Sequence, residues 1–156
     1  MKSDKDRLKQ EGHDMTLDKN RLELRRDLTP EQVDQLVDLF QQEWWTKGRE
    51  KPDVERLMAN AGPLFAFIDP LNGELVAFAR AMTDGVYKAM IFDIIVNETW
   101  RNTGLGRLLM ETVMTDPVLA SVKHRELYCL EEMLPFYEKW GFTANLPGLF
   151  FMRQSS

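Results

Sequence analysis

The stretch from residue 91 to residue 107 constrains the fold of this chain more than any other part of the sequence. Ile91–Val96 is an apolar, largely β-branched run that favours a buried strand, and the apolar spacing over 104–115 predicts a helix. Between them lies a short loop that contains Gly104 and Gly106. A strand, a loop and a helix in this order bring free backbone N–H groups and the positive end of a helix dipole to one point. The segment therefore predicts a site for a phosphate group.

Two well-known phosphate-binding loops do not fit this segment. A dinucleotide-binding fingerprint needs a small residue at position 109, where this chain has Leu109. A Walker loop needs Lys and then Ser or Thr after its last glycine, whereas Arg107 and Leu108 follow Gly106. The alternative to a phosphate site is a plain helix entry, in which the glycines only serve the turn.

The loop Arg101–Arg107 resembles the Arg/Gln-x-x-Gly-x-Gly/Ala loop of the GNAT superfamily of N-acetyltransferases. Later in the chain, Phe136–Phe142 is similar to the second signature of that family, an aromatic-Tyr-x-Lys-x-Gly-Phe helix end. The order and spacing of the two motifs match, and the resemblance runs from residue 20 to the end. It implies the GNAT fold, an α/β domain with a mixed central sheet of about six to seven strands and about four flanking helices.

The sequence pattern by itself also predicts an α/β domain with a mixed sheet. We expect residues 1–19 to form a flexible N-terminal tail and residues 20–156 to form a single domain. The expected strands cover 21–25, 64–68, 75–82, 87–96 and 126–130, with a last pair near 142–152, and the expected helices cover 30–44, 52–60, 104–115 and 132–140.

Composition limits the classes of partner. The net charge is −5 and the acidic excess lies after residue 28, which argues against a nucleic-acid partner and favours cationic substrates such as amines. No apolar run approaches the roughly 20 residues of a membrane span and the start lacks a signal-peptide pattern, so we expect no membrane association. The single cysteine suits a reducing, cytoplasmic location, and the few, scattered His and Cys residues lead us to expect no metal.

The resemblance also implies acetyl-CoA as co-substrate and assigns residues to it. The amides of the loop would bind the pyrophosphate, and the backbone of the preceding strand would pair with the pantetheine arm, where an N–H would polarise the thioester carbonyl. Two departures from the family are Glu98, where a proline is frequent, and Leu130, where many relatives carry an asparagine that contacts the cofactor. The expected cofactor residues are Ile94, Ile95, Val96, Arg101, Asn102, Thr103, Gly104, Leu105, Gly106 and Arg107.

Acetyl transfer also requires that the amine lose a proton and that the leaving thiolate be protonated or stabilised. Tyr137 matches the tyrosine that protonates the thiolate in many family members; the alternative is an aromatic residue that only packs. Asp93 is the only ionisable side chain in the run Ile91–Val96 and is our candidate for general base or amine anchor. The alternative is an aspartate paired with Arg80 or Lys88. Glu43 is a weaker candidate base.

The expected acceptor site includes Trp44, Trp45 and Arg80. In the family fold, the end of the first helix borders the acceptor, and an aromatic pair there could hold a cationic or aryl amine. The alternative is that the two tryptophans cover the core. Cys129 could be a nucleophile in a two-step reaction, but nothing near it in sequence would activate it, so a core thiol is favoured.

The resemblance implies an acetyl-CoA-dependent N-acetyltransferase that acts on a primary amine of a small molecule, such as an aryl amine or a polyamine. Two alternatives stay open: a protein or peptide N-acetyltransferase, and a non-catalytic CoA-binding regulatory module. A homodimer is left open as well. The region 43–142 is similar to small bacterial GNAT proteins, and 127–142 is also similar to plastid-type arylalkylamine acetyltransferases.

Overall fold

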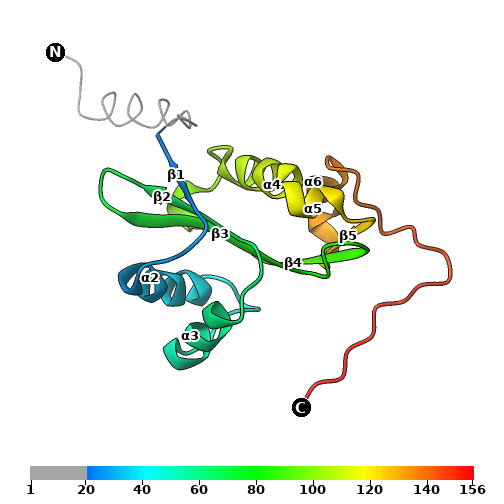
Figure 1. Ribbon diagram of the computed structural model, residues 1–156, viewed down its shortest axis with the longest axis horizontal. Coiled ribbons are helices and arrows are strands. Elements are labelled where there is room, and N and C mark those ends of the chain that lie inside the picture. The colour runs from blue at the N-terminus through cyan, green and yellow to red at the C-terminus, as the bar shows by residue number, and fades with distance from the viewer. Residues whose placement is uncertain (1–20) are drawn as a thin grey trace, which may run out of the picture.

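The structure is a computed structural model that describes residues 21–156, so the tail expected over 1–19 lies outside the described residues. Its strands form one mixed sheet in the order β1-β2-β3-β4-β5 (Figure 1). The first four strands are antiparallel, and β5 runs parallel to β4. The strands are β1 (Glu23–Arg25), β2 (Leu64–Asp69), β3 (Glu74–Thr83), β4 (Lys88–Val96) and β5 (His124–Glu126).

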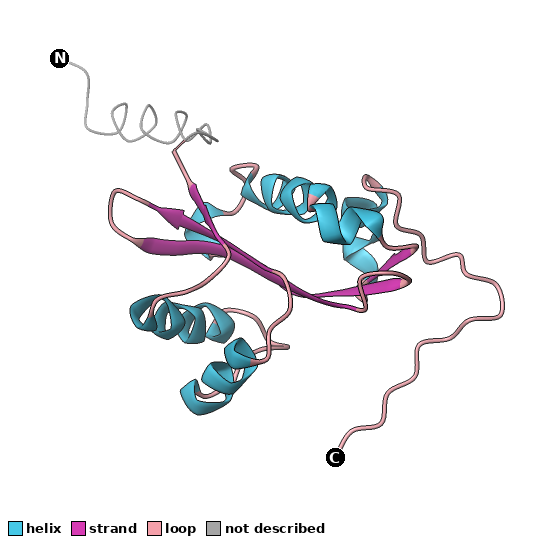
Figure 2. Ribbon diagram, in the orientation of Figure 1, coloured by secondary structure: helices cyan, strands magenta, loops and turns pink. Residues whose placement is uncertain are grey.

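Helices cover both faces of this sheet (Figure 2). Helices α2 (Pro30–Gln41) and α3 (Lys51–Ala59) lie on one face. Helices α4 (Leu105–Thr115) and α5 (Pro117–Ser121) lie on the other, with α6 (Leu134–Glu138) near β5. Short 3-10 turns precede α4 and α6, at Glu98–Trp100 and Glu131–Met133. The α/β fold with a mixed sheet is therefore confirmed.

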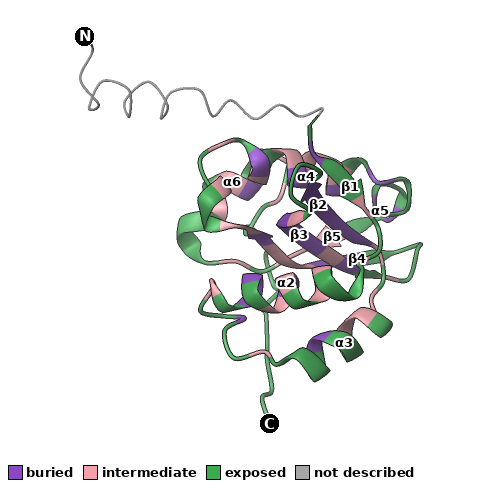
Figure 3. Ribbon diagram, turned by 90° about the vertical axis from the view of Figure 1, so that its left-hand side faces the viewer, coloured by how far each residue is buried: buried purple, intermediate pink, exposed green. Residues whose placement is uncertain are grey.

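Each face of the sheet buries its own apolar cluster, and the middle of the sheet is buried beneath the helices (Figure 3). On the α2 side, Phe40 meets Phe78 edge to face at 6.0 Å, and Ile95 packs with them. On the α4 side, Leu105 and Leu109 pack on the opposite side of the strands. Strand β2 is buried along its whole length because both faces are covered.

Local sequence signals explain the start and the end of α2. Thr29 accepts the N–H of Gln32, and Gln32 in turn accepts the N–H of Thr29, which forms a capping box around Pro30. The helix ends at Gln41, three residues before the expected Trp44. There the buried hydroxyl of Thr46 donates to the carbonyl of Phe40 at 2.7 Å and turns the chain away from the helix axis.

The end of the sheet differs from the prediction. Strand β5 covers His124–Glu126 instead of 126–130, and no strand pair forms over 142–152, so the sheet has five strands instead of six to seven. Beyond Glu126 the chain leaves β4, and the C-terminal stretch runs away from the sheet without a strand partner (Figure 1). Pro147 lacks an N–H and Gly148 has a φ of 79°, which together turn this stretch instead of extending it.

Helix α5 was not predicted, although a signal for it is present. Asp116 accepts the N–H groups of Val118 and Leu119, and Pro117 occupies the first helical position. This Asp-Pro pair starts a short new helix directly after α4. Asp84 and Gly85 form the turn between β3 and β4, where Asp84 accepts the N–H of Val86 and Gly85 has a φ of 75°.

Candidate active site

Strands β4 and β5 separate soon after they pair. Their parallel pairing is limited to Lys88–Met90 on β4, so the rest of that edge, through Val96, faces no strand in residues 21–156. Asp93 has a φ of 54°, and the register of β3 against β4 shifts at this point, which is the pattern of a β-bulge. The split leaves the edge of the 94–96 backbone available for pairing with a ligand. This is the region where a pantetheine arm was expected.

The loop 101–107 offers free backbone donors. The N–H groups from Asn102 to Arg107 donate no hydrogen bond to any described residue, and the N–H of Leu108 is the first that the helix uses, 3.1 Å from the Gly104 carbonyl. Asn102 (φ 60°) and Gly104 (φ 90°) both have left-handed backbone, which curls the loop tightly. Consecutive free amides at the start of an 11-residue helix are the arrangement that binds phosphate.

The two arginines of this loop are ion-paired. Arg101 lies 2.7 Å from Glu43 and Arg107 lies 3.1 Å from Glu111. Their positive charge is therefore partly offset, and the backbone amides remain the main anion donors. Glu98, where the family often has proline, donates its N–H to Gln42 at 3.0 Å, a hydrogen bond that proline could not make.

The two sequence motifs meet at Gly106. A Cβ atom on this glycine would lie 3.7 Å from the Phe136 ring of α6 and 3.8 Å from the side chain of Val96. The end of β4, the start of α4 and the helix of the second motif therefore converge on one gap. The absent side chain of Gly106 leaves that gap open.

Tyr137 presents a free hydroxyl beside this convergence. Its side chain is only 8% exposed and its ring packs edge to face on Phe136 at 5.0 Å and on Phe142 at 6.3 Å. The hydroxyl makes no hydrogen bond to residues 21–156, yet it is not among the fully buried polar atoms, so it opens onto a ligand-accessible space. Burial, with a smaller contribution from the charge of Cys129, raises the pKa of Tyr137 to about 12. The phenol is therefore protonated at neutral pH.

Cys129 does not have the surroundings of a nucleophile. Burial raises the pKa of its thiol, which keeps the sulfur protonated and unreactive.

Asp93 is held by two arginines. Its carboxylate is 5% exposed and lies 2.7 Å from Arg80 Nε, while Arg49 approaches both carboxylate oxygens, at 3.0 Å and 2.9 Å. Lys88, the other partner considered, pairs with Glu126 instead. Sequence reasoning missed Arg49 because it lies on a loop far away in the chain and no spacing links it to β4. We call Arg49, Arg80 and Asp93 the arginine cluster.

Residues 42–49, here called segment 42–49, connect the loop 101–107 to the arginine cluster. Gln42 and Glu43 hold it to Glu98 and Arg101 at one end, and Arg49 holds it to Asp93 at the other. Trp44 is 68% exposed and meets Trp45 edge to face at 5.9 Å, so this pair lies on the surface and does not cover the core.

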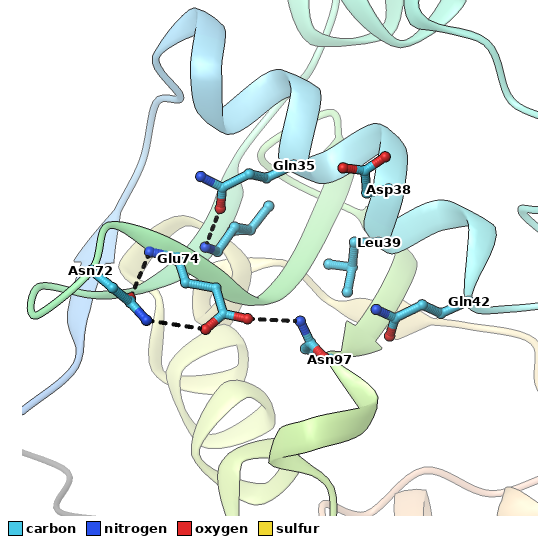
Figure 4. A pocket seen from close by; sticks show the side chains of 8 residues that line it. Gln35, Asp38, Leu39, Gln42, Asn72, Glu74 and Asn97 are labelled. Carbon is cyan, nitrogen blue, oxygen red and sulfur yellow. Dashed lines mark hydrogen bonds between the residues drawn. The ribbon is translucent and has the colours of Figure 1, made fainter.

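The described part of the chain has hollows on its surface. One, of about 340 Å³, lies between α2 and the β2–β3 turn (Figure 4). Its polar side chains bind one another: Glu74 accepts from Asn72 and Asn97, and Gln35 accepts the Leu75 N–H. These bonds brace Asn97, which precedes the loop 101–107.

Another hollow, of about 480 Å³, is lined by Leu130, Glu131 and Glu132. Its lining includes Leu130, the position where many relatives carry an asparagine. No group of three or more metal-ligating His, Cys, Asp or Glu side chains occurs within residues 21–156. None of the helices described here is both long and apolar enough to cross a membrane.

Comparisons with known proteins agree with this geometry. The model of the acetyltransferase (GNAT) family matches residues 26–142. The chloroplastic GCN5-related N-acetyltransferase 1 of Arabidopsis thaliana is 35% identical over 82 residues, which are 51% of this chain and 42% of that protein. The chloroplastic serotonin N-acetyltransferase 2 of Oryza sativa subsp. japonica is 37% identical over 73 residues, 47% of this chain and 36% of that protein. These matches span less than half the length of either relative.

A solved structure from Xanthomonas campestris pv. campestris, described as belonging to the GNAT family, is similar over most of its length. It superposes with a TM-score of 0.72 at 26% identity, and the match covers 86% of this chain and 93% of that one.

Proposed function

The chain belongs to the GNAT family of acetyltransferases, and from this we propose that it transfers the acetyl group of acetyl-CoA directly to the primary amine of a small molecule. The observation that carries the proposal is the run of free amides from Asn102 to Arg107 beside the open edge of β4. A phosphate site and an unpaired strand edge in succession suit a ligand that carries a pyrophosphate followed by an amide-containing arm.

In this proposal acetyl-CoA supplies the activated acetyl thioester, and the residues of the chain hold it. The amides of loop 101–107 bind the pyrophosphate, and the backbone of Ile94–Val96 pairs with the arm. The gap between Val96 and Phe136 fits this role, since a side chain at Gly106 would fill it.

Tyr137 donates to the leaving sulfur. A phenol whose pKa is about 12 is protonated throughout the neutral range, so its hydroxyl is always ready to hydrogen-bond a thiolate and to return a proton to it. Its hydroxyl has no competing partner in the described residues.

A small amine is favoured over a protein acceptor by two observations. Trp44 and Trp45 form an exposed aromatic pair within segment 42–49, which can bind a cationic or aryl amine. The serotonin N-acetyltransferase of Oryza sativa, one of the relatives, takes its name from an arylalkylamine.

Two measurements on the full chain test the proposal. Calorimetric titration with acetyl-CoA should show binding, and an assay of thiol release should detect turnover with one class among aryl amines, polyamines, amino acids and peptides. Binding without release from any amine would favour a CoA-binding module. Release with peptides alone would favour a protein or peptide acetyltransferase.

A further inference from the structure

The arginine cluster carries more positive charge than its own carboxylate offsets. Two guanidinium groups face one carboxylate, and Asp93 is buried whereas Arg49 and Arg80 remain 30% and 15% exposed. The chain as a whole is acidic, with a net charge of −5. A partly buried group of excess cations is expensive to keep in a fold unless an anion completes it.

The cluster also has spare hydrogen-bond donors. Arg80 contacts Asp93 through Nε alone, and its terminal nitrogens have no partner within residues 21–156. The only fully buried side-chain nitrogen or oxygen without a hydrogen bond in that region is Arg49 Nη1, so the terminal nitrogens of Arg80 are reachable by a ligand. Each guanidinium has five N–H groups in a planar fork that suits a carboxylate.

Aromatic rings continue outward from the cluster. The guanidinium of Arg80 stacks over Phe92 at 4.7 Å, Phe92 lies 6.4 Å from Tyr128, and Tyr128 lies 5.0 Å from Phe151. Tyr128 and Phe151 are exposed, and the guanidinium of Arg153 lies over both rings, 5.3 Å and 5.5 Å from their centroids. The row therefore forms an aromatic surface beside the cluster, with a further cation at its outer end.

The position of the cluster along β4 separates it from the phosphate site. Asp93 lies three residues before Val96, which places it about 10 Å upstream of the strand end at a strand rise of about 3.3 Å per residue. The cluster thus lies toward the thioester end of the bound arm, where the acceptor must enter, and away from loop 101–107.

We infer that Arg49 and Arg80, oriented by Asp93, bind a carboxylate on the acceptor, and that the acceptor class is aromatic amino acids. The inference rests on the proposed acetyl transfer. In that reaction the amine nitrogen bonds the acetyl carbon, the carbon–sulfur bond breaks, the amine loses one proton and the leaving sulfur gains one. Asp93 is a positioning residue here, and the aromatic row receives the ring of the acceptor.

Matched substrates test this inference directly. The wild-type chain should acetylate phenylalanine and tryptophan with a KM about 10–100-fold below that of phenethylamine and tryptamine, which lack only the carboxylate. Arg80→Gln should raise the KM for the amino acids by a similar factor and leave the KM for the amines unchanged. Arg80→Lys should recover part of the affinity. Arg56→Gln, an exposed change on α3, is the matched control and should alter neither.

Binding of the products separates this inference from the proposed function. N-acetylphenylalanine should bind the wild-type chain in calorimetry, whereas N-acetylphenethylamine should bind far more weakly. If no amine is acetylated but this difference persists, the proposed function fails and the carboxylate site stands. If Arg80→Gln does not fold, the double variant Arg80→Gln with Asp93→Asn takes its place in these measurements. It removes the Arg80 cation and the Asp93 carboxylate together, so that neither is left without its partner.

Three results would overturn the inference. The first is equal or better acetylation of the decarboxylated amines by the wild-type chain. The second is an equal change in KM for both substrates in Arg80→Gln. The third is a loss of acetyl-CoA affinity in Arg80→Gln, which would assign the cluster to the co-substrate.

Discussion

At the scale of single residues, the ring of Tyr137 is buried among other aromatic rings, whereas its hydroxyl has no hydrogen-bond partner in the described chain. We expect Tyr137→Phe to lower kcat by about 10²–10³ with little change in acetyl-CoA affinity, because only the proton donor is lost while the ring still packs. Steady-state kinetics and calorimetry would measure the two effects. A fully active variant would show that the ring only packs.

The raised pKa of Tyr137 makes a separate prediction about pH. The acid form of a phenol with a pKa of about 12 persists to high pH, so the wild-type rate should show no alkaline loss from this group below about pH 11. An ordinary tyrosine would lose its proton near pH 10. A pH–rate profile of kcat, extended as far as the fold allows, would distinguish them; a decline centred near pH 10 that is absent in Tyr137→Phe would contradict the burial effect.

The two loop glycines should respond differently to substitution. A Cβ at Gly106 meets its neighbours at ordinary contact distances, so Gly106→Val should keep the fold while filling the gap at the end of β4 and abolishing acetyl-CoA binding. Gly104 has a φ of 90°, so any side chain there adds about 1–2 kcal/mol of backbone strain as well. Thermal melts and calorimetry on both variants would separate stability from binding, and normal binding by Gly106→Val would refute the loop assignment.

Substitution of Asp93 distinguishes two roles for its carboxylate, which are to orient the two arginines and to act as general base. If it mainly orients Arg49 and Arg80, Asp93→Asn should lower the free energy of unfolding by about 1–3 kcal/mol, because two cations lose their partner, and the acidic side of the pH–rate profile should keep its shape. If Asp93 is the general base, that acidic side should flatten. Denaturant unfolding and pH–rate measurements on the same variant decide between the two.

At the scale of elements, structure that depends on residues close in sequence was predicted better than the pairing of strands. The strand-loop-helix unit of β4 and α4 depends on residues close in sequence, and it was predicted correctly. A strand was predicted over 126–130, but strand pairing there depends on β4, which bulges at Asp93 and separates from β5. Likewise, the partners of Arg49 and Gly106 come from distant segments that no local spacing specifies.

The cap of α2 gives an element-scale prediction. Thr29→Ala removes the side chain that accepts the Gln32 N–H, so the free energy of unfolding should fall by about 1 kcal/mol. Catalysis should not change, because the cap is at the opposite end of α2 from segment 42–49. Urea denaturation measures the change, and an unaltered midpoint would mean that the exposed cap contributes nothing.

At the scale of the whole molecule, apolar side chains gather on the C-terminal stretch. Leu149, Phe150 and Met152 are exposed, and the outer edge of β5 has no strand partner in the described residues. Exposed apolar segments beside an open sheet edge favour association, so we predict a homodimer in which this stretch covers the partner's edge. Light scattering should show a dimer that Phe150→Ser with Met152→Ser converts to a monomer, while Leu71→Ser on the exposed β2–β3 turn should not. A monomeric wild-type chain at high concentration would contradict this.

Segment 42–49 links the binding of acetyl-CoA to the binding of the acceptor. It is tied by Glu43 to Arg101 at the loop and by Arg49 to Asp93 at the cluster. An anion that draws Arg101 away from Glu43 loosens one anchor and so changes how firmly Arg49 is held at the other. Thermodynamic reciprocity then requires each ligand to alter the affinity of the other by the same factor. Because segment 42–49 is short and joins the two ion pairs, acetyl-CoA and the acceptor would bind cooperatively. In Glu43→Gln the two ligands would bind independently.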